Sequence, residues 1–368
     1  MKRFIGLMSG TSLDGLDVVC ATFEEPSSWA IEGARTFTFP SALVTRLSAL
    51  AKAQDNNLES MAQVAIHWSN FAAGCIDQLL SEMQLSARDI TAIGSHGQTI
   101  RHCPNADTPF SVQIGCPSTL SELTHITVVA DFRSRDIAAK GQGAPLVPAF
   151  HGELFAGNSW LTLNLGGIAN IAYRNRGGEL MGYDTGPANI LINHLCQRDF
   201  NCDYDLNGDI AQRGSVQAAA LSNMLSDPFF QQTAPKSTGP EYFNLAWFDA
   251  HCGKISPEDA VATATELTAQ SIAREIVAQA EIQDIWVFGG GVKNVTLMNS
   301  LQRALISMGC TAVIRDTQQI DIDPDFMEAL VFAWLAERCL DYLPGNCPSV
   351  TGAERAVILG GIYPVSQG

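Results

Sequence analysis

The order of hydrophobic and polar positions along the chain predicts an α/β protein. Alternating or short continuous apolar runs predict strands over residues 3–8, 17–23, 30–39, 90–94, 110–114, 126–130, 160–165, 168–173 and 284–288. Apolar residues at helical spacing predict helices over residues 58–85, 188–196, 257–280, 295–306 and 326–336. A strand, a turn and a returning strand open each half of the chain, so we expect an antiparallel hairpin in each half.

The length of the chain favours two domains. Its 368 residues allow two domains of the usual size, each with its own core. Residues 140–148 are rich in glycine and proline, which is typical of a connection between domains. We place the boundary near residue 135, giving domain I over residues 1–135 and domain II over residues 136–368. The C-terminal segment is a candidate to pack back on domain I.

Three turns rich in glycine are the main candidates for ligand binding. Two join the strands of a hairpin, and the third joins a strand to a helix. Glycine leaves backbone amides bare, so an anionic or flat ligand can lie against them. An ordinary loop or a solvated hairpin turn is the alternative for each. The candidate nucleotide-binding residues are Gly10, Thr11, Ser12, Asp14, Gly15, Gly166, Gly167, Gly289, Gly290, Gly291, Lys293 and Asn294.

A run of polar residues follows the strand predicted over residues 90–94. Residues 95–102 make poor core, but they suit a surface that forms hydrogen bonds with a hydroxylated ligand. Gln98 and Thr99 are the better candidates for ligand contact. His96 is also a candidate, although a structural histidine is the favoured interpretation of that residue by itself.

Two arginines follow the strand predicted over residues 126–130. In so acidic a chain, Arg133 and Arg135 are candidates to bind a carboxylate or a phosphate. An ion pair with Asp131 or Asp136 is the alternative for either arginine.

Two carboxylates are candidates for catalysis. Asp184 follows the second glycine hairpin and is the leading candidate for a catalytic base; its alternative is a helix cap. Glu328 lies in the apolar helix predicted over residues 326–336, where a carboxylate is costly unless it is paired or functional. The alternative to a functional role for Glu328 is that the helix N-terminus simply stabilises its charge.

Composition excludes several classes of partner. A formal net charge of −16 argues against nucleic acid and anionic membranes, which both require a basic surface. The 10 cysteines are scattered without a CxxC pair, as in reduced cytosolic proteins. Because no apolar run approaches about 20 residues, we expect no membrane span and a cytoplasmic location.

Taken in order, the motifs resemble the anhydro-N-acetylmuramic acid kinase family, within the superfamily of actin, sugar kinases and heat-shock chaperone ATPases. The resemblance covers nearly the whole chain and is carried by residues 6–15, 95–99, 131–133, 141–146, 164–170, 184–187, 236–239 and 289–291. The chain departs from the pattern at Lys140, where the family usually has glycine.

The resemblance implies a two-domain actin-like (ribonuclease H-like) fold, with a mixed central sheet in each domain and an ATP cleft between them. The first two glycine turns would hold the phosphates and the third the adenosine. Asp14 would bind Mg²⁺ directly or through water, and the protein would be a homodimer.

The implied reaction is ATP-dependent. Water opens the 1,6-anhydro ring of 1,6-anhydro-N-acetylmuramic acid at C1, and O6 accepts the γ-phosphoryl group. By similarity, Asp184 is the general base, Glu328 supports it, and Thr99 and Arg133 contact the sugar. A kinase for another amino sugar, a nucleotide-gated binding protein and a glycoside hydrolase are the alternative classes.

Overall fold

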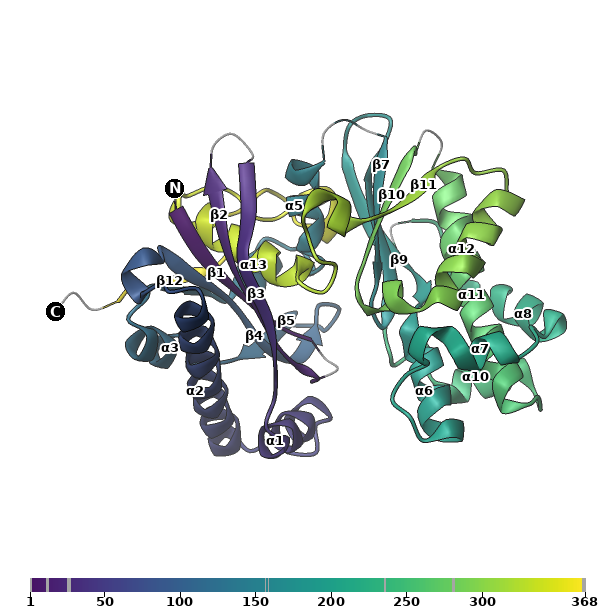
Figure 1. Cartoon of the computed structure of the whole chain (residues 1–368), viewed down its shortest axis with the longest axis horizontal. Helices are drawn as coiled ribbons and strands as arrows, with labels where there is room; N and C mark the ends of the chain where they lie inside the picture. The colour runs from purple at the N-terminus through teal and green to yellow at the C-terminus, as the bar shows by residue number, and fades with distance from the viewer. Residues whose placement is uncertain are drawn as a thin grey trace. The chain divides into compact units, whose positions relative to one another are not determined.

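The chain folds into two compact units, each described here by itself. The computed structural model describes residues 2–10, 13–24, 28–155, 157, 159–234, 236–279 and 282–365. The first unit comprises Met1–Leu154 and Phe326–Gly368, and the second comprises Phe155–Asp325 (Figure 1).

The first unit is built on a seven-stranded mixed sheet in the order β12-β6-β4-β1-β2-β3, with β5 paired to β4. Strands β1, β2 and β3 form an antiparallel meander, whereas β4 runs parallel to β1 and β6 runs parallel to β4. The strands are β1 (Lys2–Ser9), β2 (Gly15–Glu24), β3 (Ser28–Thr38), β4 (Ala92–Cys103), β5 (Phe110–Ile114), β6 (Val128–Ala130) and β12 (Gly361–Tyr363). The antiparallel hairpin expected at the start of the chain is therefore present, and the strand predicted over residues 30–39 extends it as β3.

Helices cover both faces of this sheet (Figure 1). They are α1 (Ser41–Ala51), α2 (Leu58–Glu82), η1 (Ala87–Asp89), α3 (Pro117–Thr124), α4 (Phe132–Ala138), α5 (Val147–Leu154), α13 (Met327–Leu340) and α14 (Pro348–Thr351). Helix α13 packs directly on the central strands, because Gly6 and Gly94 lie side by side in the sheet. A Cβ at Gly6 would lie 1.8 Å from the Ala329 carbonyl oxygen.

Strand β4 is longer than the sequence pattern predicts. The polar residues 95–102 do not follow the strand but lie within it. Ser95 pairs with β1 and β6, and β5 pairs with the second half of β4, from Gln98 opposite Ile114 to Cys103 opposite Phe110. The polar side chains therefore stand on a rigid strand.

The division into units also differs from the boundary expected near residue 135. The chain passes from the first unit to the second after Leu154, because α4 and α5 belong to the first unit. The carboxylate of Asp136, which is fully buried, accepts hydrogen bonds from Asn346 (2.7 Å) and Thr351 (2.8 Å). These contacts bind the segment that follows the expected boundary to the C-terminal segment, and both belong to the first unit.

The second unit has a five-stranded mixed sheet in the order β11-β10-β7-β8-β9. Strands β7, β8 and β9 form an antiparallel meander, and β10 and β11 continue the sheet in parallel. The strands are β7 (Trp160–Leu165), β8 (Ile168–Arg174), β9 (Leu180–Pro187), β10 (Asp284–Phe288) and β11 (Val313–Asp316). Both units thus repeat one arrangement, which confirms the predicted α/β class with a mixed sheet in each part.

Helices complete the second unit (Figure 1). They are α6 (Asn189–Phe200), η2 (Leu206–Gly208), α7 (Asp209–Arg213), α8 (Ala218–Leu225), α9 (Pro228–Gln231), α10 (Leu245–Cys252), α11 (Pro257–Ala278), η3 (Gly290–Lys293), α12 (Val295–Ser307) and η4 (Thr317–Ile320). Helices α11 and α12 bury Ile272, Leu297 and Leu301 in the same core as β7 residue Leu163.

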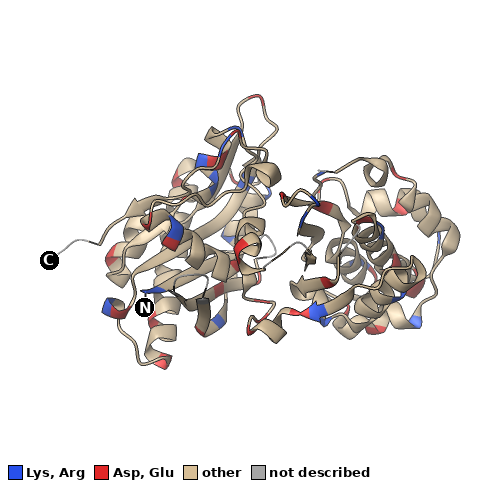
Figure 2. Cartoon of the chain, turned by 90° about the horizontal axis from the view of Figure 1, so that it is seen from above, with Lys and Arg blue, Asp and Glu red and all other residues tan. Residues whose placement is uncertain are grey.

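Charged residues are distributed over both units. In the view of Figure 2, Lys and Arg lie interspersed with Asp and Glu. Among the described residues, none of the helices combines the length and the apolar character that a bilayer span requires.

Lys140 occupies a backbone conformation that favours glycine. Its φ is +72°, in the left-handed region, where a Cβ costs about 1–2 kcal/mol. We therefore expect Lys140→Gly to raise the free energy of unfolding by up to about 1 kcal/mol, measured by urea denaturation. The matched control is Lys52→Gly, since Lys52 is also exposed but has a φ of −82°. That substitution should lower stability; equal effects of both variants would contradict the assignment of strain to Lys140.

Candidate functional site

The first glycine turn is anchored by a side chain from β4. The amide nitrogen of Gln98, which is fully buried, donates to the Gly10 carbonyl at 3.0 Å. Its Oε1 has no hydrogen-bond partner among the described residues. Gln98, predicted to contact ligand, therefore has a structural contact with the turn. Thr11 and Ser12, which were predicted to bind nucleotide, lie outside the described residues.

Two further candidates of the first turn have different surroundings. Asp14 is exposed, as a metal-binding or phosphate-facing carboxylate requires. Gly15 is explained by packing, because a Cβ there would lie 2.6 Å from the Phe37 carbonyl oxygen.

Open space lies over three of the glycines in the second unit. A Cβ at Gly290 would meet nothing within 4 Å, and at Gly166 or Gly167 it would meet only ordinary contacts at 3.6 Å or more. Packing therefore does not require glycine at these positions, which leaves room for a ligand against the backbone. The opposite holds for Gly289 and Gly291, where a Cβ would lie 2.5 Å from Asn164 Oδ1 and 2.7 Å from Leu165 Cβ, respectively.

The second turn is held rigidly by the start of α6. The side-chain amide of Asn189 donates to the carbonyls of Leu165 (2.8 Å) and Gly166 (2.7 Å). The backbone nitrogen of Ala188 donates to the Gly167 carbonyl at 2.9 Å. These bonds fix the turn between β7 and β8 before any ligand binds.

Lys293 and Asn294 each have a partner within the second unit. The ammonium group of Lys293 pairs with Asp325, and its side chain is 69% exposed. Asn294 caps α12, since its Oδ1 accepts a hydrogen bond from the Leu297 amide at 2.9 Å. Lys293 is the more accessible of these two candidates.

Arg133 and His96 form a buried pair in the first unit. Arg133 Nε and Nη2 donate to His96 Nε2 at 3.1 and 2.9 Å, and Nη1 donates to the Gly143 carbonyl at 2.8 Å. Burial lowers the pKa of the Arg133 guanidinium to about 10, although the charges of Glu328 and Asp136 raise it. Arg133 is thus held by an imidazole and a carbonyl, not by the ion pair with Asp131 or Asp136 that was the sequence alternative.

Glu328 lies in the first turn of α13 without a direct partner. Within the described part of the chain, no hydrogen bond or ion pair engages its carboxylate, which is partly buried. Burial raises the pKa of the Glu328 carboxyl, while the positive charge of Arg133 lowers it and Asp17 raises it. Two features therefore favour the charged form of the Glu328 carboxyl: the positive charge of Arg133 and the N-terminus of α13.

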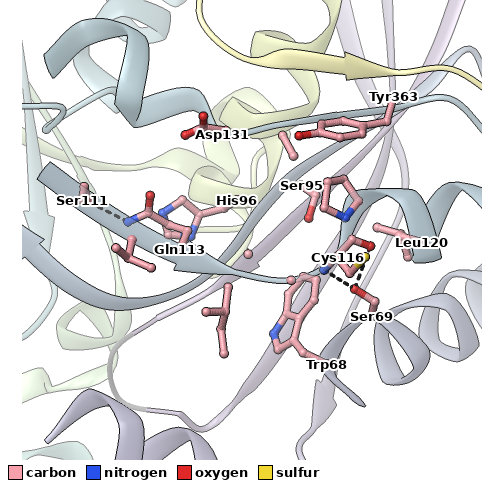
Figure 3. Close-up of a pocket in the computed structure, with 16 residues that line it drawn as sticks. Trp68, Ser69, Ser95, His96, Ser111, Gln113, Cys116, Leu120, Asp131 and Tyr363 are labelled. Carbon is pink, nitrogen blue, oxygen red and sulfur yellow. Dashed lines mark hydrogen bonds between the residues drawn. The ribbon is translucent and has the colours of Figure 1, made fainter. Parts of the chain in front are cut away.

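A cavity of about 220 Å³ lies in the first unit beside His96 (Figure 3). Its lining comes from α2, β4, β5, α3 and the end of β12, and includes Trp68, His96, Gln113, Cys116, Asp131 and Tyr363. The amide nitrogen of Gln113 donates to Thr99 Oγ1 at 3.1 Å. The structure therefore connects two of the predicted sugar contacts, His96 and Thr99, to one cavity.

Asp184 lies on β9 and is held by residues from a distant loop. Its Oδ2 accepts hydrogen bonds from the Thr238 backbone nitrogen (2.9 Å) and the Ser237 hydroxyl (3.3 Å). Since α6 begins only at Asn189, Asp184 does not cap that helix. Burial raises the pKa of the Asp184 carboxyl to about 6, against the Thr238 and Ser237 hydrogen bonds, which lower it. A carboxylate with this pKa is suited to accept a proton near neutral pH.

The loop that holds Asp184 is itself fixed in the core. The side-chain ammonium of Lys236 is 1% exposed and pairs with Glu275 at 2.6 Å. Glu275 also accepts a hydrogen bond from the Tyr183 hydroxyl at 3.0 Å. Lys236 therefore positions the next two residues of the loop against Asp184.

The pH dependence of activity should report the Asp184 environment. A base with a pKa of about 6 is ionised above that pH, so kcat/KM should fall as the pH drops below 6. Ser237→Ala removes a hydrogen bond to the charged form, and we expect it to move this acid limb to higher pH. The control is Thr238→Ser, since Thr238 donates through its backbone. An unchanged limb in Ser237→Ala would contradict the prediction.

Several residues of the site were not identified as such from the sequence. Ser237 and Thr238 belong to a motif that carried the family resemblance, but no spacing links them to Asp184. Trp68 fits the apolar face of the helix predicted over residues 58–85, so nothing in the sequence pattern indicates that it lines a cavity. Gln113 lies in a short predicted strand, and only the pairing of β5 with β4 brings it to Thr99.

The described side chains offer few ligands for a metal ion. Among the described residues, no group of three or more His, Cys, Asp or Glu side chains could hold a metal ion. Mg²⁺ in phosphate-transfer sites needs only one or two carboxylates, because the phosphates and water supply the other ligands. The single exposed carboxylate of Asp14 fits that requirement.

The fold defines the class of this protein. In each unit an antiparallel meander is extended by parallel strands, and a glycine turn joins the first two strands of the second sheet. This arrangement makes the protein a two-unit α/β protein with a mixed sheet in each unit. Two solved structures align with it at low similarity. The first is the activator of the 2-hydroxyisocaproyl-CoA dehydratase from Clostridium difficile, with 10% identity, a TM-score of 0.44 and coverage of 90% of this chain and 92% of that chain. The second is a hexokinase from Schistosoma mansoni, with 11% identity, a TM-score of 0.41 and coverage of 91% of this chain and 85% of that chain.

Sequence comparison identifies the family. The family model described as anhydro-N-acetylmuramic acid kinase matches residues 2–365. The anhydro-N-acetylmuramic acid kinases of Coxiella burnetii strains Dugway 5J108-111 and RSA 493 are each 43% identical over 371 residues, covering 98% of this chain and 97% of theirs. The chain belongs to the anhydro-N-acetylmuramic acid kinase family, as its motifs predicted.

Proposed function

We propose that this protein is an ATP-dependent kinase of cell-wall recycling that acts on 1,6-anhydro-N-acetylmuramic acid. Water adds to C1, the bond between C1 and O6 breaks, and O6 takes the γ-phosphoryl group of ATP. The products are N-acetylmuramic acid 6-phosphate and ADP. The observation that carries this proposal is membership of the family over residues 2–365.

Asp184 is the general base in this proposal. Its carboxylate would take a proton from the attacking water, so that the oxygen can bond to C1. The hydrogen bonds from Ser237 and Thr238 support this role, because they fix the carboxylate and leave its other oxygen, Oδ1, for the water.

The first unit supplies the sugar contacts. Thr99 and Arg133 are assigned to the sugar, with Arg133 facing the lactyl carboxylate or the developing phosphate charge. Glu328 supports the base as a second carboxylate. His96 positions Arg133 through the two hydrogen bonds that it accepts.

The glycine turns are assigned to the nucleotide. Gly10 with Thr11 and Ser12, and Gly166 with Gly167, would hold the phosphates, while residues 289–291 would hold the adenosine. Asp14 would bind Mg²⁺ directly or through water, and the ion would neutralise charge on the phosphates during transfer. The open space over Gly166, Gly167 and Gly290 supports this assignment.

Product analysis tests the proposal. The protein should form ADP with 1,6-anhydro-N-acetylmuramic acid and far less with N-acetylglucosamine, glucosamine or N-acetylmuramic acid. In water labelled with ¹⁸O, the label should appear at C1 of the phosphorylated product. A phosphorylated sugar without label would indicate a kinase for another amino sugar, and sugar hydrolysis without ADP would indicate a glycoside hydrolase.

Location and assembly complete the proposal. All ten cysteines are free thiols, which supports a reducing, cytoplasmic location. A homodimer is expected from the family resemblance, and light scattering of the purified protein would measure it.

A further inference from the structure

We propose that Glu275 on α11 is a positioning residue for Asp184. Its carboxylate holds two residues, Tyr183, which precedes Asp184 on β9, and Lys236, which precedes Ser237 in the loop beside it. The inference rests on the proposed function, in which Asp184 is the general base. All five residues belong to the second unit.

The two oxygens of the Glu275 carboxylate each have their own partner. Lys236 Nζ lies 2.6 Å from Oε1, and the Tyr183 hydroxyl donates to Oε2 at 3.0 Å. Gln279 Nε2 donates to the same hydroxyl at 3.2 Å, which leaves the hydroxyl proton for Glu275. The side chains of Lys236 and Glu275 are 1% and 19% exposed, so solvent screens their attraction little. One carboxylate therefore fixes the separation of the two side chains.

Strand β9 and the loop divide their side chains in the same way. Tyr183 and Asp184 are neighbours on β9, so their side chains point to opposite faces of the sheet. In the loop, Lys236 contacts Glu275 while Ser237 contacts Asp184. Between these contacts the Asp184 backbone nitrogen donates to the Lys236 carbonyl at 3.0 Å. Glu275 thus sets the register of the loop on one side, and Asp184 receives the loop's hydrogen bonds on the other.

Glu275 supplies the negative charge that the buried ammonium of Lys236 requires. Among the described residues, the other contacts of this ammonium are neutral. They are the Phe229 carbonyl at 3.4 Å and the Phe229 ring, whose centroid is 4.9 Å away. A buried charge that has lost its partner is strongly destabilising. Without the Glu275 carboxylate, we expect the loop to shift until Lys236 reaches water, which would draw Ser237 away from Asp184.

The pKa of Asp184 distinguishes positioning from a direct electrostatic effect. The hydrogen bonds from the loop lower this pKa, so their loss should raise it. Direct electrostatics has the opposite sign, because removing the charge of Glu275 leaves the positive Lys236, which would lower the pKa of Asp184. The charge of Glu241, which raises the pKa of Asp184, is retained throughout.

The first variant is Glu275→Gln, whose amide oxygen can still accept from Tyr183. We expect the pKa of the Asp184 carboxyl to rise by about 0.5–1, and the acid limb of kcat/KM to move to higher pH by the same amount. A ¹³C NMR titration of protein labelled at the aspartate carboxyl carbons measures the pKa. The Asp184 signal is assigned by its absence from the spectrum of Asp184→Asn.

The matched control is Glu266→Gln on the same helix. Glu266 precedes Glu275 by nine positions, about two and a half turns, so it lies on the opposite face of α11. Its carboxylate accepts a hydrogen bond from Gln270 at 2.8 Å. This variant should leave both the pKa of Asp184 and the acid limb unchanged.

A second variant, Lys236→Met/Glu275→Gln, removes both charges together. No unpaired buried charge remains, so thermal unfolding should show a folded protein. The pKa of Asp184 should rise here too, because the loop has lost its anchor. An unchanged or lower pKa in either variant would overturn the inference.

The NMR titration separates this inference from the proposed reaction, because it requires no turnover. A rise in both variants supports the positioning role even if the wild type forms no ADP, a result that would refute the kinase reaction alone. ADP formation by the wild type without a rise in the variants would refute the positioning role alone.

Discussion

Asp184→Asn is expected to lower kcat by about 10²–10⁴-fold, because an amide cannot accept the proton from the attacking water. The substitution keeps the size of the side chain, and its Oδ1 can still accept the Thr238 hydrogen bond. The affinity for ATP should therefore change little. Steady-state ADP release and calorimetric titration with a non-hydrolysable ATP analogue measure the two quantities.

The matched control for this variant is Asp203→Asn, which removes an exposed carboxylate from the same unit. It should leave kcat unchanged. Near-normal turnover in Asp184→Asn would rule out the assignment of the base. A loss of ATP binding of the same size as the loss in kcat would instead assign Asp184 to the nucleotide site.

Gly290→Leu is expected to raise the KM for ATP by about tenfold or more, with a smaller effect on the KM for the sugar. A Cβ at this position meets nothing within 4 Å, so the protein leaves space for a side chain to begin there. The leucine would occupy the space that we assign to adenosine. Initial rates with each substrate varied in turn provide both KM values.

The control is Gly74→Leu, because Gly74 in α2 also has no atom within 4 Å of a Cβ. It should leave both KM values unchanged and raise stability slightly through helix propensity. If Gly290→Leu affected the sugar KM more than the ATP KM, the adenosine would have to lie elsewhere.

Local patterns predicted much of the fold. Apolar spacing gave the three strands of the first meander, the β7–β8 hairpin and the long helices α2 and α11, because periodicity depends only on which face of an element is buried. It did not predict β9, which completes the second meander. It did not predict that β4 runs through the polar residues 95–102. Their place in a strand depends on pairing with β1, β5 and β6, and no property of the residues themselves reports those partners.

The boundary between the units shows the same limit. Glycine and proline after Asp136 suggested a connection, yet those residues wrap around the buried Asp136 carboxylate, and the Gly143 amide donates to it at 2.7 Å. A segment rich in turns can belong to a core as well as to a linker. Only the contacts with Asn346 and Thr351 decide between the two.

The sequence by itself determined the glycine turns, the candidate carboxylates and the family, because these depend on residue types in a fixed order. The tertiary structure alone decided which groups surround them. Thr238 reaches Asp184 across 54 positions, and Gln98 reaches Gly10 across 88. Such contacts form only when distant segments pack together, and burial then sets the pKa of Asp184.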